Sequence, residues 1–395
     1  MTLVVVSGAR ADVVADWNET AMATLAQTAT PLLPATRAMA LLHAAIFDAM
    51  NAVERRYAPY RAQPAAAPDA SSDAAASAAA HAVLSRLYPA RANELAESHR
   101  KALAGIADGA AKARGIEVGE RVAAELLAAR AADASLAPIA YRPAAAPGIY
   151  VPTPLPTGLE QPRATPWLIK RADQFRPAPP PALKSVQWAR DYDEVRTLGG
   201  RASEKRSAEQ SEIARFWIVV WPQSWNPIVR QLAAAPGRTP LQNARLFALT
   251  SMVAADAFIA VFDAKYAYAF WRPITAIRNG DLDGNDATAR DAAWLPLVDT
   301  PLHPEYPCAH CIVAGAVGAV LEAEFGRGRL GVLTMASPTA PGVTRRWERI
   351  ADIVEEISNA RVWGGIHYRS STRAGEAMGR ALGEFALANH LRPIN

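Results

Sequence analysis

The sequence has little of several features that mark other classes of protein. Only two of its 395 residues are cysteine, Cys308 and Cys311, so no disulfide framework reports the compartment in which the chain works. Runs of alternating β-branched and polar residues are rare, and long stretches rich in Ala, Leu, Arg and Glu take their place. These stretches predict an all-α protein, and its length allows a large core in one domain or two.

A large excess of one charge is also missing. The formal net charge is +4 and the pI is about 9.1, with basic and acidic residues interspersed. No basic block carries interleaved aromatic residues, so nucleic acid is not predicted as a partner. No apolar run approaches the ~18 residues that a membrane span needs, so no membrane span is predicted.

The N-terminus carries a weak targeting pattern. An apolar run over residues 3–6 precedes Ala9-Arg10-Ala11, which is similar to the A-x-A cleavage site of a secretion signal. The basic segment of such a signal is missing and the apolar run is short. The compartment therefore stays open, and the pattern slightly favours export to the periplasm or the medium over an ordinary N-terminal tail.

Helical periodicity and proline content divide the chain into three parts. Helices are expected over residues 12–30, 36–54, 71–87, 89–107 and 117–132, which make residues 1–137 an N-terminal helical bundle. Residues 138–182 form a proline-rich strap, and residues 183–395 form a C-terminal helical bundle. His43 and Asp48 lie in the second predicted helix, where a lone histidine is usually a core group and not a catalyst.

The strap contains 12 prolines between residues 138 and 181 and has no helical period. A structureless segment of this length is usually functional or a linker. An ordered strap is favoured because Tyr150, Trp167, Ile169 and Phe175 give it side chains that can dock on a core. A flexible linker between two half-domains is the alternative.

Two cations begin the chemistry of the C-terminal part. Lys265 and Arg272 are seven residues apart, nearly two helical turns, so the spacing predicts that both side chains share one helix face before Pro273 ends the helix. Side-by-side cations repel each other, and an anion held between them removes that repulsion. Arg supplies a planar fork of donors to such an anion, and Lys a point charge.

Two further clusters offer matching groups. Pro307-Cys308-Ala309-His310 precedes an apolar helix, so its residues lie at a helix N-terminus, where free N–H groups and the helix dipole favour an anion. Arg361 ends another helix, Gly364-Gly365 permits an unusual backbone, and His367 follows. If these groups converge with Lys265 and Arg272, the site can hold a tetrahedral oxyanion, either phosphate or vanadate.

Together the clusters resemble the vanadium-dependent haloperoxidases and, more distantly, the type 2 phosphatidic acid phosphatases and bacterial acid phosphatases. That family pattern is Lys, six residues, Arg-Pro; then Pro-Ser-Gly-His; then Ser-Arg, five residues, His. Phe270-Trp271 before Arg272 and His303 seven residues before His310 are more similar to the haloperoxidase branch, as are the N-terminal Asp16-Trp17-Asn18 and the helix with His43.

The resemblance implies an all-α fold of two four-helix bundles, with the site in the C-terminal one. It implies vanadate as the cofactor, with phosphate able to occupy the same site. The implied cofactor-binding residues are Lys265, Arg272, Cys308, Ala309, Arg361 and His367. Of these, Lys265, Arg272 and Arg361 would neutralise the equatorial oxygens, and His367 would bond the vanadium.

The implied activity is oxidation of a halide by hydrogen peroxide to hypohalous acid, which then acts on a small organic substrate. His310 would be the general acid–base. His303 matches a position near the halide route, so bromide is expected as the halide. The resemblance leaves a homo-oligomer open.

Some features depart from the family pattern, and other functions stay open. Cys308 and Ala309 replace Ser and Gly, and Ala360 replaces the Ser before Arg361; a thiol is a weaker donor than a hydroxyl. A phosphatase with His367 as nucleophile is the main alternative. Cys308-x-x-Cys311 also allows a redox dithiol or part of a zinc site. A non-enzymatic helical scaffold is the last alternative, and it does not explain the paired cations.

Overall fold

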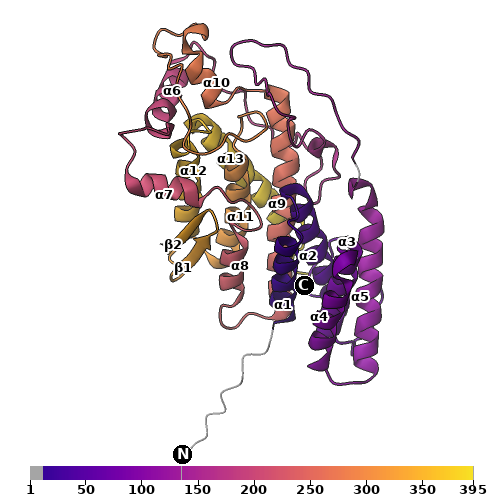
Figure 1. Ribbon diagram of the computed structural model, residues 1–395. Coiled ribbons are helices and arrows are strands. Elements are labelled where there is room, and N and C mark those ends of the chain that lie inside the picture. Colours follow the sequence, from indigo (N-terminus) through magenta and orange to yellow (C-terminus); the bar gives the residue numbers. More distant parts are fainter. Residues whose placement is uncertain (1–11, 135, 395) are drawn as a thin grey trace, which may run out of the picture. The chain divides into compact units, whose positions relative to one another are not determined.

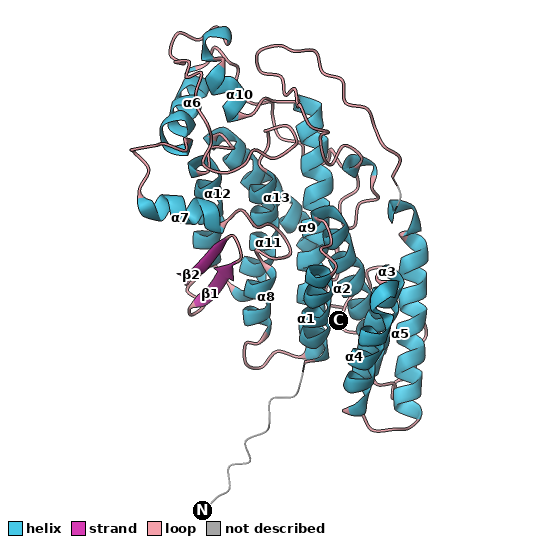
Figure 2. Cartoon of the chain, in the orientation of Figure 1, coloured by secondary structure: helices cyan, strands magenta, loops and turns pink. Residues whose placement is uncertain are grey.

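The structure is a computed structural model that describes residues 12–134 and 136–394. Over these residues it is mostly α-helical and has one two-stranded sheet (Figure 2). The predicted all-α, helical-bundle class is therefore confirmed, with a small hairpin that the sequence did not predict. The N-terminal A-x-A pattern lies outside the described residues.

The chain forms two compact units. The first contains residues up to 131, residues 232–251 and the C-terminal end from residue 390; the second contains residues 132–231 and 252–389. The sequence-based division into residues 1–137, 138–182 and 183–395 stays a prediction. All the residues of the predicted oxyanion site belong to the second unit.

The first unit is built from five helices and the beginning of a sixth (Figure 1). They are α1 (Val13–Gln27), α2 (Leu32–Glu54), α3 (Ser72–Leu87), α4 (Ala92–Ala104), α5 (Ala110–Ala129) and the first residues of α9 (Pro240–Tyr268). The side chains of Asp12 and Ser71 cap α1 and α3, as short polar side chains do at helix starts. The buried positions of α3 are mostly alanine, which lets α2 and α5 pack closely against it.

The second unit is organised around α11 (Ala309–Phe325), which is buried over most of its length. It packs against α13 (Arg369–Asn389) and α12 (Ile350–Trp363), and α12 also contacts α6 (Val186–Gly199) and α7 (Ala208–Phe216). Small residues along α11 allow this close packing. The site residues therefore attach to the most buried helices of the unit.

The remaining elements are short. Two further helices are α8 (Asn226–Ala233) and α10 (Pro273–Arg278), and the hairpin pairs β1 (Leu333–Ser337) with β2 (Ala340–Trp347) in antiparallel fashion. Single 3₁₀ turns lie at Pro89–Arg91, Ala131–Ala134, Gln161–Arg163 and Gly280–Leu282. The first of these turns replaces the start of the helix predicted over residues 89–107.

The proline-rich strap is tied to the second unit by hydrogen bonds. The buried carboxylate of Asp256 accepts the N–H groups of three successive strap residues, Trp167, Leu168 and Ile169, at 2.6, 2.6 and 2.9 Å. Further along, Arg176 forms a two-pronged ion pair with Asp263 at 2.8 Å. Because Asp256 and Asp263 both lie on α9, this helix supports the strap over two turns.

Two helices meet the length and composition that a membrane span requires, Leu32–Glu54 and Pro240–Tyr268. The sequence-based statement that no apolar run is long enough is therefore wrong for these two. Their apolar windows are 78% and 94% buried inside the structure, as in the core helices of a folded domain. They are weak evidence for a membrane, and no membrane span is clearly indicated.

Replacing Asp256 with Ala should free the strap. The change leaves three buried N–H groups without their acceptor, which should lower the free energy of unfolding by about 3–5 kcal/mol. Urea unfolding measures the loss, and limited proteolysis should show new cleavage within residues 138–182. Asp173→Ala, at an exposed ion pair with Arg171, is the control and should change neither readout. Equal proteolysis of both variants would contradict this role of Asp256.

Candidate oxyanion site

The two cations of the first cluster converge, but not in the way that the sequence predicted. Helix α9 ends at Tyr268, Ala269 has a positive φ of 47°, and Arg272 is the extended cap residue of α10. Lys265 and Arg272 therefore do not share a helix face, and that prediction is wrong. Pro273 favours an extended residue before it, which ends helical geometry earlier than expected.

Both side chains nevertheless reach the same loop. Lys265 Nζ donates to the carbonyls of Pro304 and Glu305 at 2.9 and 2.8 Å. Arg272 Nε donates to the carbonyl of His303 at 2.9 Å, and its Nη2 lies 2.9 Å from His303 Nδ1. The loop from His303 to Glu305 therefore fixes the two cations, and both are almost fully buried.

Arg361 and His367 reach this place from α12. The chain leaves the helix at Gly364 and turns at Gly365, whose φ is 79° and whose Cα lies so close to the Gly199 carbonyl that a Cβ would stand 2.3 Å from it. Only glycine fits there. The turn directs His367 back into the core, where its Nε2 lies 3.4 Å from Arg272 Nη1.

The cluster from Pro307 to His310 lies at the start of α11, as predicted. Cys308 is the cap residue, Ala309 is buried in the first turn, and His310 is partly buried with Nε2 donating to the carbonyl of Ile218 at 3.2 Å. Cys308 is bonded to Cys311 in a disulfide. The sequence analysis treated Cys308 as a free thiol and therefore as a weak donor; in the structure it has no S–H to donate.

The five basic groups lie close enough to influence one another's pKa values. Burial lowers the pKa of Lys265 well below its usual value, and nearby Arg272 and Arg361 lower it further. The pKa values of Arg272 and Arg361 fall to about 10 and 9, in both cases mainly through burial. Burial, with these cations nearby, also lowers the pKa of His310 and of His367 well below 6.5. A bound oxyanion would relieve this repulsion.

Glu305 is a central residue that the sequence analysis missed. Its Oε1 accepts the Nδ1–H of His367 at 2.6 Å and the N–H of Tyr368 at 3.1 Å. Both the carboxylate and the imidazole are buried. The neutral imidazole thus carries its proton on Nδ1 and presents the lone pair of Nε2 to the cations. Its position as an acid in the loop between His303 and Pro307 was the available signal.

The sequence also missed the segment around Trp217. Its backbone carbonyl accepts Arg361 Nη1 at 2.6 Å, and the next carbonyl, of Ile218, accepts His310. These two acceptors hold Arg361 and His310 on the same side of the site. Backbone carbonyls carry no sequence signal, so this contact could not be predicted from residue types.

One donor in the site has no partner. Arg361 Nε is buried and makes no hydrogen bond with any residue that the structure describes. A buried guanidinium N–H without an acceptor is costly, and an oxyanion oxygen is the acceptor that suits it. With three cations and one carboxylate around it, the site fits a multiply charged oxyanion such as vanadate or phosphate.

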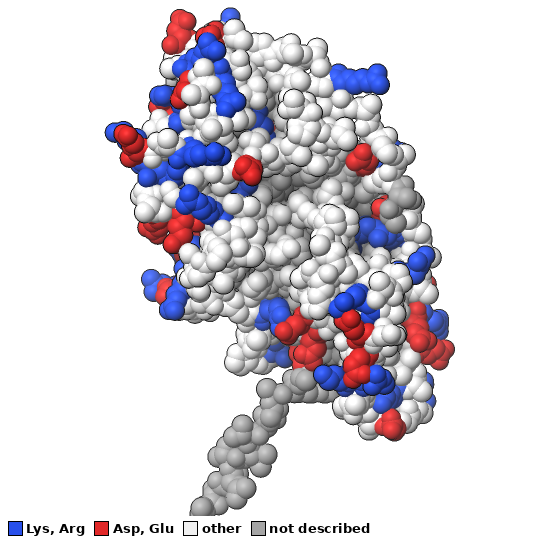
Figure 3. Space-filling model, viewed as in Figure 1, with Lys and Arg blue, Asp and Glu red and all other residues white. Residues whose placement is uncertain are grey.

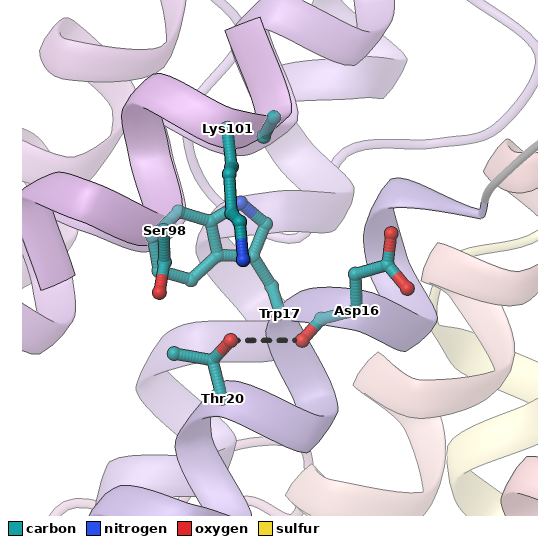
Figure 4. Close-up of a pocket in the computed structure, with 6 residues that line it drawn as sticks. Asp16, Trp17, Thr20, Ser98 and Lys101 are labelled. Atoms are coloured by element: carbon teal, nitrogen blue, oxygen red, sulfur yellow. Dashed lines mark hydrogen bonds between the residues drawn. The ribbon is translucent and has the colours of Figure 1, made fainter. Parts of the chain in front are cut away.

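A conventional metal cluster is not found. No group of three or more His, Cys, Asp or Glu side chains within residues 12–134 and 136–394 could hold a metal ion. The zinc alternative therefore has no ligand set in the described part of the chain. A pocket of about 290 Å³ in the first unit, lined by α1 and α4 residues such as Trp17 and Lys101, contains none of the predicted site residues (Figure 4).

Comparisons with known proteins show which proteins the chain is similar to. Residues 245–395 match the family model of the VCPO second helical-bundle domain, the part that holds Lys265, Arg272, His310, Arg361 and His367. This part of the chain is therefore similar in sequence to the vanadium haloperoxidases. It is 31% identical over 188 residues to the vanadium chloroperoxidase of Curvularia inaequalis, a match that covers 39% of this chain but only 30% of that protein.

Solved structures of the family share the fold over almost the whole chain. A bacterial vanadium-dependent iodoperoxidase superposes with a TM-score of 0.80 at 24% identity, covering 97% of both chains. A holo-type bacterial vanadium-dependent chloroperoxidase superposes with a TM-score of 0.69 at 17% identity, covering 90% of this chain and 91% of that one. At these identities the likeness concerns the fold.

Sulfate affinity should report the charge of Glu305. Burial raises the pKa of this carboxyl to about 7, although nearby Arg272 and Lys265 oppose the shift. A bound anion would raise it further, so binding takes up a proton, and affinity should fall as the pH rises above about 7. A shift of about one pKa unit on binding gives about a tenfold loss, measurable by titration calorimetry.

Sulfate is the probe because its charge does not change near neutral pH. Glu305→Gln is the matched control, since its amide oxygen still accepts the Nδ1–H of His367 but carries no charge. It should bind sulfate with the same affinity on both sides of pH 7. A wild-type affinity that does not change with pH would show that Glu305 does not titrate beside the anion.

Proposed function

We propose that this chain is a vanadate-dependent haloperoxidase, which oxidises a halide with hydrogen peroxide to hypohalous acid. The observation that carries the proposal is the meeting of Lys265, Arg272 and Arg361 with the Nε2 of a neutral His367. The match of residues 245–395 to the family model supports it, and the small share of the Curvularia inaequalis protein that the match covers makes the activity a proposal.

Different residues would make different contacts with bound vanadate. His367 Nε2 would be the single protein ligand, and its lone pair is kept available by the hydrogen bond from Nδ1 to Glu305. Lys265, Arg272 and Arg361 would neutralise the oxygens, with the unpaired Arg361 Nε as one donor. Backbone N–H groups in the first turn of α11, at Ala309 next to Cys308, would add uncharged hydrogen-bond donors to the vanadate oxygens.

Bound vanadate would supply Lewis acidity that polarises hydrogen peroxide toward attack by halide. The residues of the chain itself would contribute acid–base catalysis and electrostatic stabilisation. His310 would move the proton between peroxide and water, because a neutral imidazole can both accept and return it. The three cations stabilise the negative charge that grows on oxygen, which is usually the larger effect.

Bromide is the proposed halide. His303 contacts Arg272 through Nδ1 and packs edge-to-face on Phe262 at 5.3 Å, so it forms part of the wall of the site. A polar imidazole at this wall, in place of a purely apolar side chain, supports an easily oxidised halide. The proposed partners are hydrogen peroxide, bromide and a small organic substrate. On the face shown in Figure 3, basic and acidic side chains are interspersed, which does not suggest a nucleic-acid surface.

Phosphomonoester hydrolysis is the second candidate. A histidine nucleophile needs the same free Nε2 and the same carboxylate on Nδ1 as His367 and Glu305 provide. The three cations would also suit a phosphoryl group. The geometry of the side chains therefore serves both reactions.

An assay of the purified protein should separate the two. Bromination of an organic dye or a diketone by peroxide is expected only with added vanadate, and it should be faster with bromide than with chloride. Hydrolysis of a chromogenic phosphate ester should be negligible. Ester cleavage that vanadate inhibits, without bromination, would reverse the order of the two functions.

His367→Ala should abolish vanadate binding. Removal of a direct ligand should weaken the affinity by more than the roughly 10–100-fold that loss of an outer partner costs. Direct titration by ultraviolet difference spectra or calorimetry measures it, with circular dichroism as the test of folding. His81→Ala, on α3 of the first unit, is the control and should bind normally. Unchanged affinity of His367→Ala would remove the ligand assignment.

A further inference from the structure

The Cys308–Cys311 pair has no part in the proposed function. The two sulfurs are bonded, and their Cα atoms lie 5.3 Å apart, within the ordinary range for a disulfide. The spacing of three residues places both side chains on one face of the first turn of α11. Both residues are buried, with exposed fractions of 0% and 1%.

The pair lies in the wall of the oxyanion site. Cys308 N–H donates to the carbonyl of Ser371 at 3.2 Å, and the hydroxyl of the same Ser371 lies 3.3 Å from His367 Nδ1. On the other side, Cys308 is two residues from His310, which lies within the electrostatic reach of Arg361 and Lys265. One residue, Ser371, thus separates Cys308 from the proposed vanadium ligand.

Helix α13 leaves no room beside the pair. A Cβ placed on Gly375 would stand 2.5 Å from the Cys308 carbonyl oxygen and 3.1 Å from Cys311 Cβ. A disulfide adds no atoms to this packing. A sulfinic or sulfonic acid adds two or three oxygens and a negative charge to a fully buried side chain beside this contact, which should disturb the packing of α13 on α11.

We propose that Cys308 and Cys311 form a second peroxide-reactive site, in which closure of the bridge stops cysteine oxidation at the disulfide. The inference rests on the proposed function only for the presence of peroxide in the site. The disulfide is then the working state of a chain that handles peroxide, and it protects the close contact between α11 and α13.

The reaction consumes one hydrogen peroxide. The Cys308 thiolate attacks one oxygen, the O–O bond breaks, and the leaving hydroxide becomes water with the thiol proton. The resulting sulfenic acid is attacked by the Cys311 sulfur, the S–O bond breaks, and a second water leaves as the S–S bond forms. The two thiols lose two electrons and peroxide gains them.

Mass spectrometry tests the proposal directly. The full-length chain is reduced with a phosphine, freed of it, and exposed to hydrogen peroxide without vanadate and without halide. In the wild type, both cysteines should stop reacting with a thiol reagent, and the intact mass should fall by two hydrogens. No oxygen should be added at cysteine. Oxidation of its methionines is the internal control that enough peroxide was added to oxidise sulfur. Two thiols that persist when methionine is already oxidised would overturn the proposal.

Two single variants distinguish the roles of the cysteines. Cys311→Ser has no partner to close the bridge, so Cys308 should gain two or three oxygens, and phosphate affinity should fall after peroxide treatment. Cys308→Ser should gain none at Cys311, because only the Cys308 sulfur caps α11, where it accepts the N–H of Cys311 and a thiolate is favoured. The reverse pattern, or no oxygen gain in Cys311→Ser, would contradict the assignment.

The outcome is independent of catalysis. A chain that closes its bridge under peroxide but does not brominate retains this inference and loses the proposed function. A chain that brominates while Cys311→Ser resists over-oxidation retains the function and loses the inference. Circular dichroism of each variant before peroxide confirms that both start folded.

Discussion

The second unit depends on one buried carboxylate held among cations. Glu305 accepts from His367 through its side chain, accepts from Lys265 through its carbonyl and donates from its N–H to the Phe270 carbonyl at 2.8 Å. It therefore joins α9, the loop before α11 and the segment after α12. Burying a cation costs free energy unless opposite charge and hydrogen-bond acceptors lie near it, and Glu305 supplies both.

The negative charge of Glu305 does not fully neutralise the cations around it. Three cations face one carboxylate whose pKa burial raises to about 7, so the site retains positive charge near neutral pH. Backbone carbonyls satisfy most of the N–H groups without adding charge. An unpaired N–H donor and net positive charge remain, and a multiply charged oxyanion would supply the matching acceptors and negative charge. Stability of the empty site and affinity for an anion are thus opposed.

The fold holds these groups through contacts that lie both distant from the site and beside it. The strap is anchored on α9 by Asp256, and the same helix carries Lys265 nine residues later. Gly365 meets Gly199 so closely that α12 and α6 fix the path to His367. The disulfide at the start of α11 fixes the turn that carries His310. Rigid elements thus supply the precision that an oxyanion site needs.

The sequence by itself determined the helical class and indicated a likeness to the vanadium haloperoxidases, because Ala- and Leu-rich periodicity and three spaced motifs are local properties. It also determined which five basic residues meet, since their types and spacing are specific. It could not show that Lys265 and Arg272 lie on different elements, because Pro273 and the positive φ of Ala269 end α9 early. The spacing of Cys308 and Cys311 already allowed a dithiol, and the structure shows the two sulfurs bonded. The contacts of Glu305 and of the Trp217 carbonyl were decided only by tertiary structure. Each depends on contacts between residues brought together by packing, or on a backbone group that every residue possesses.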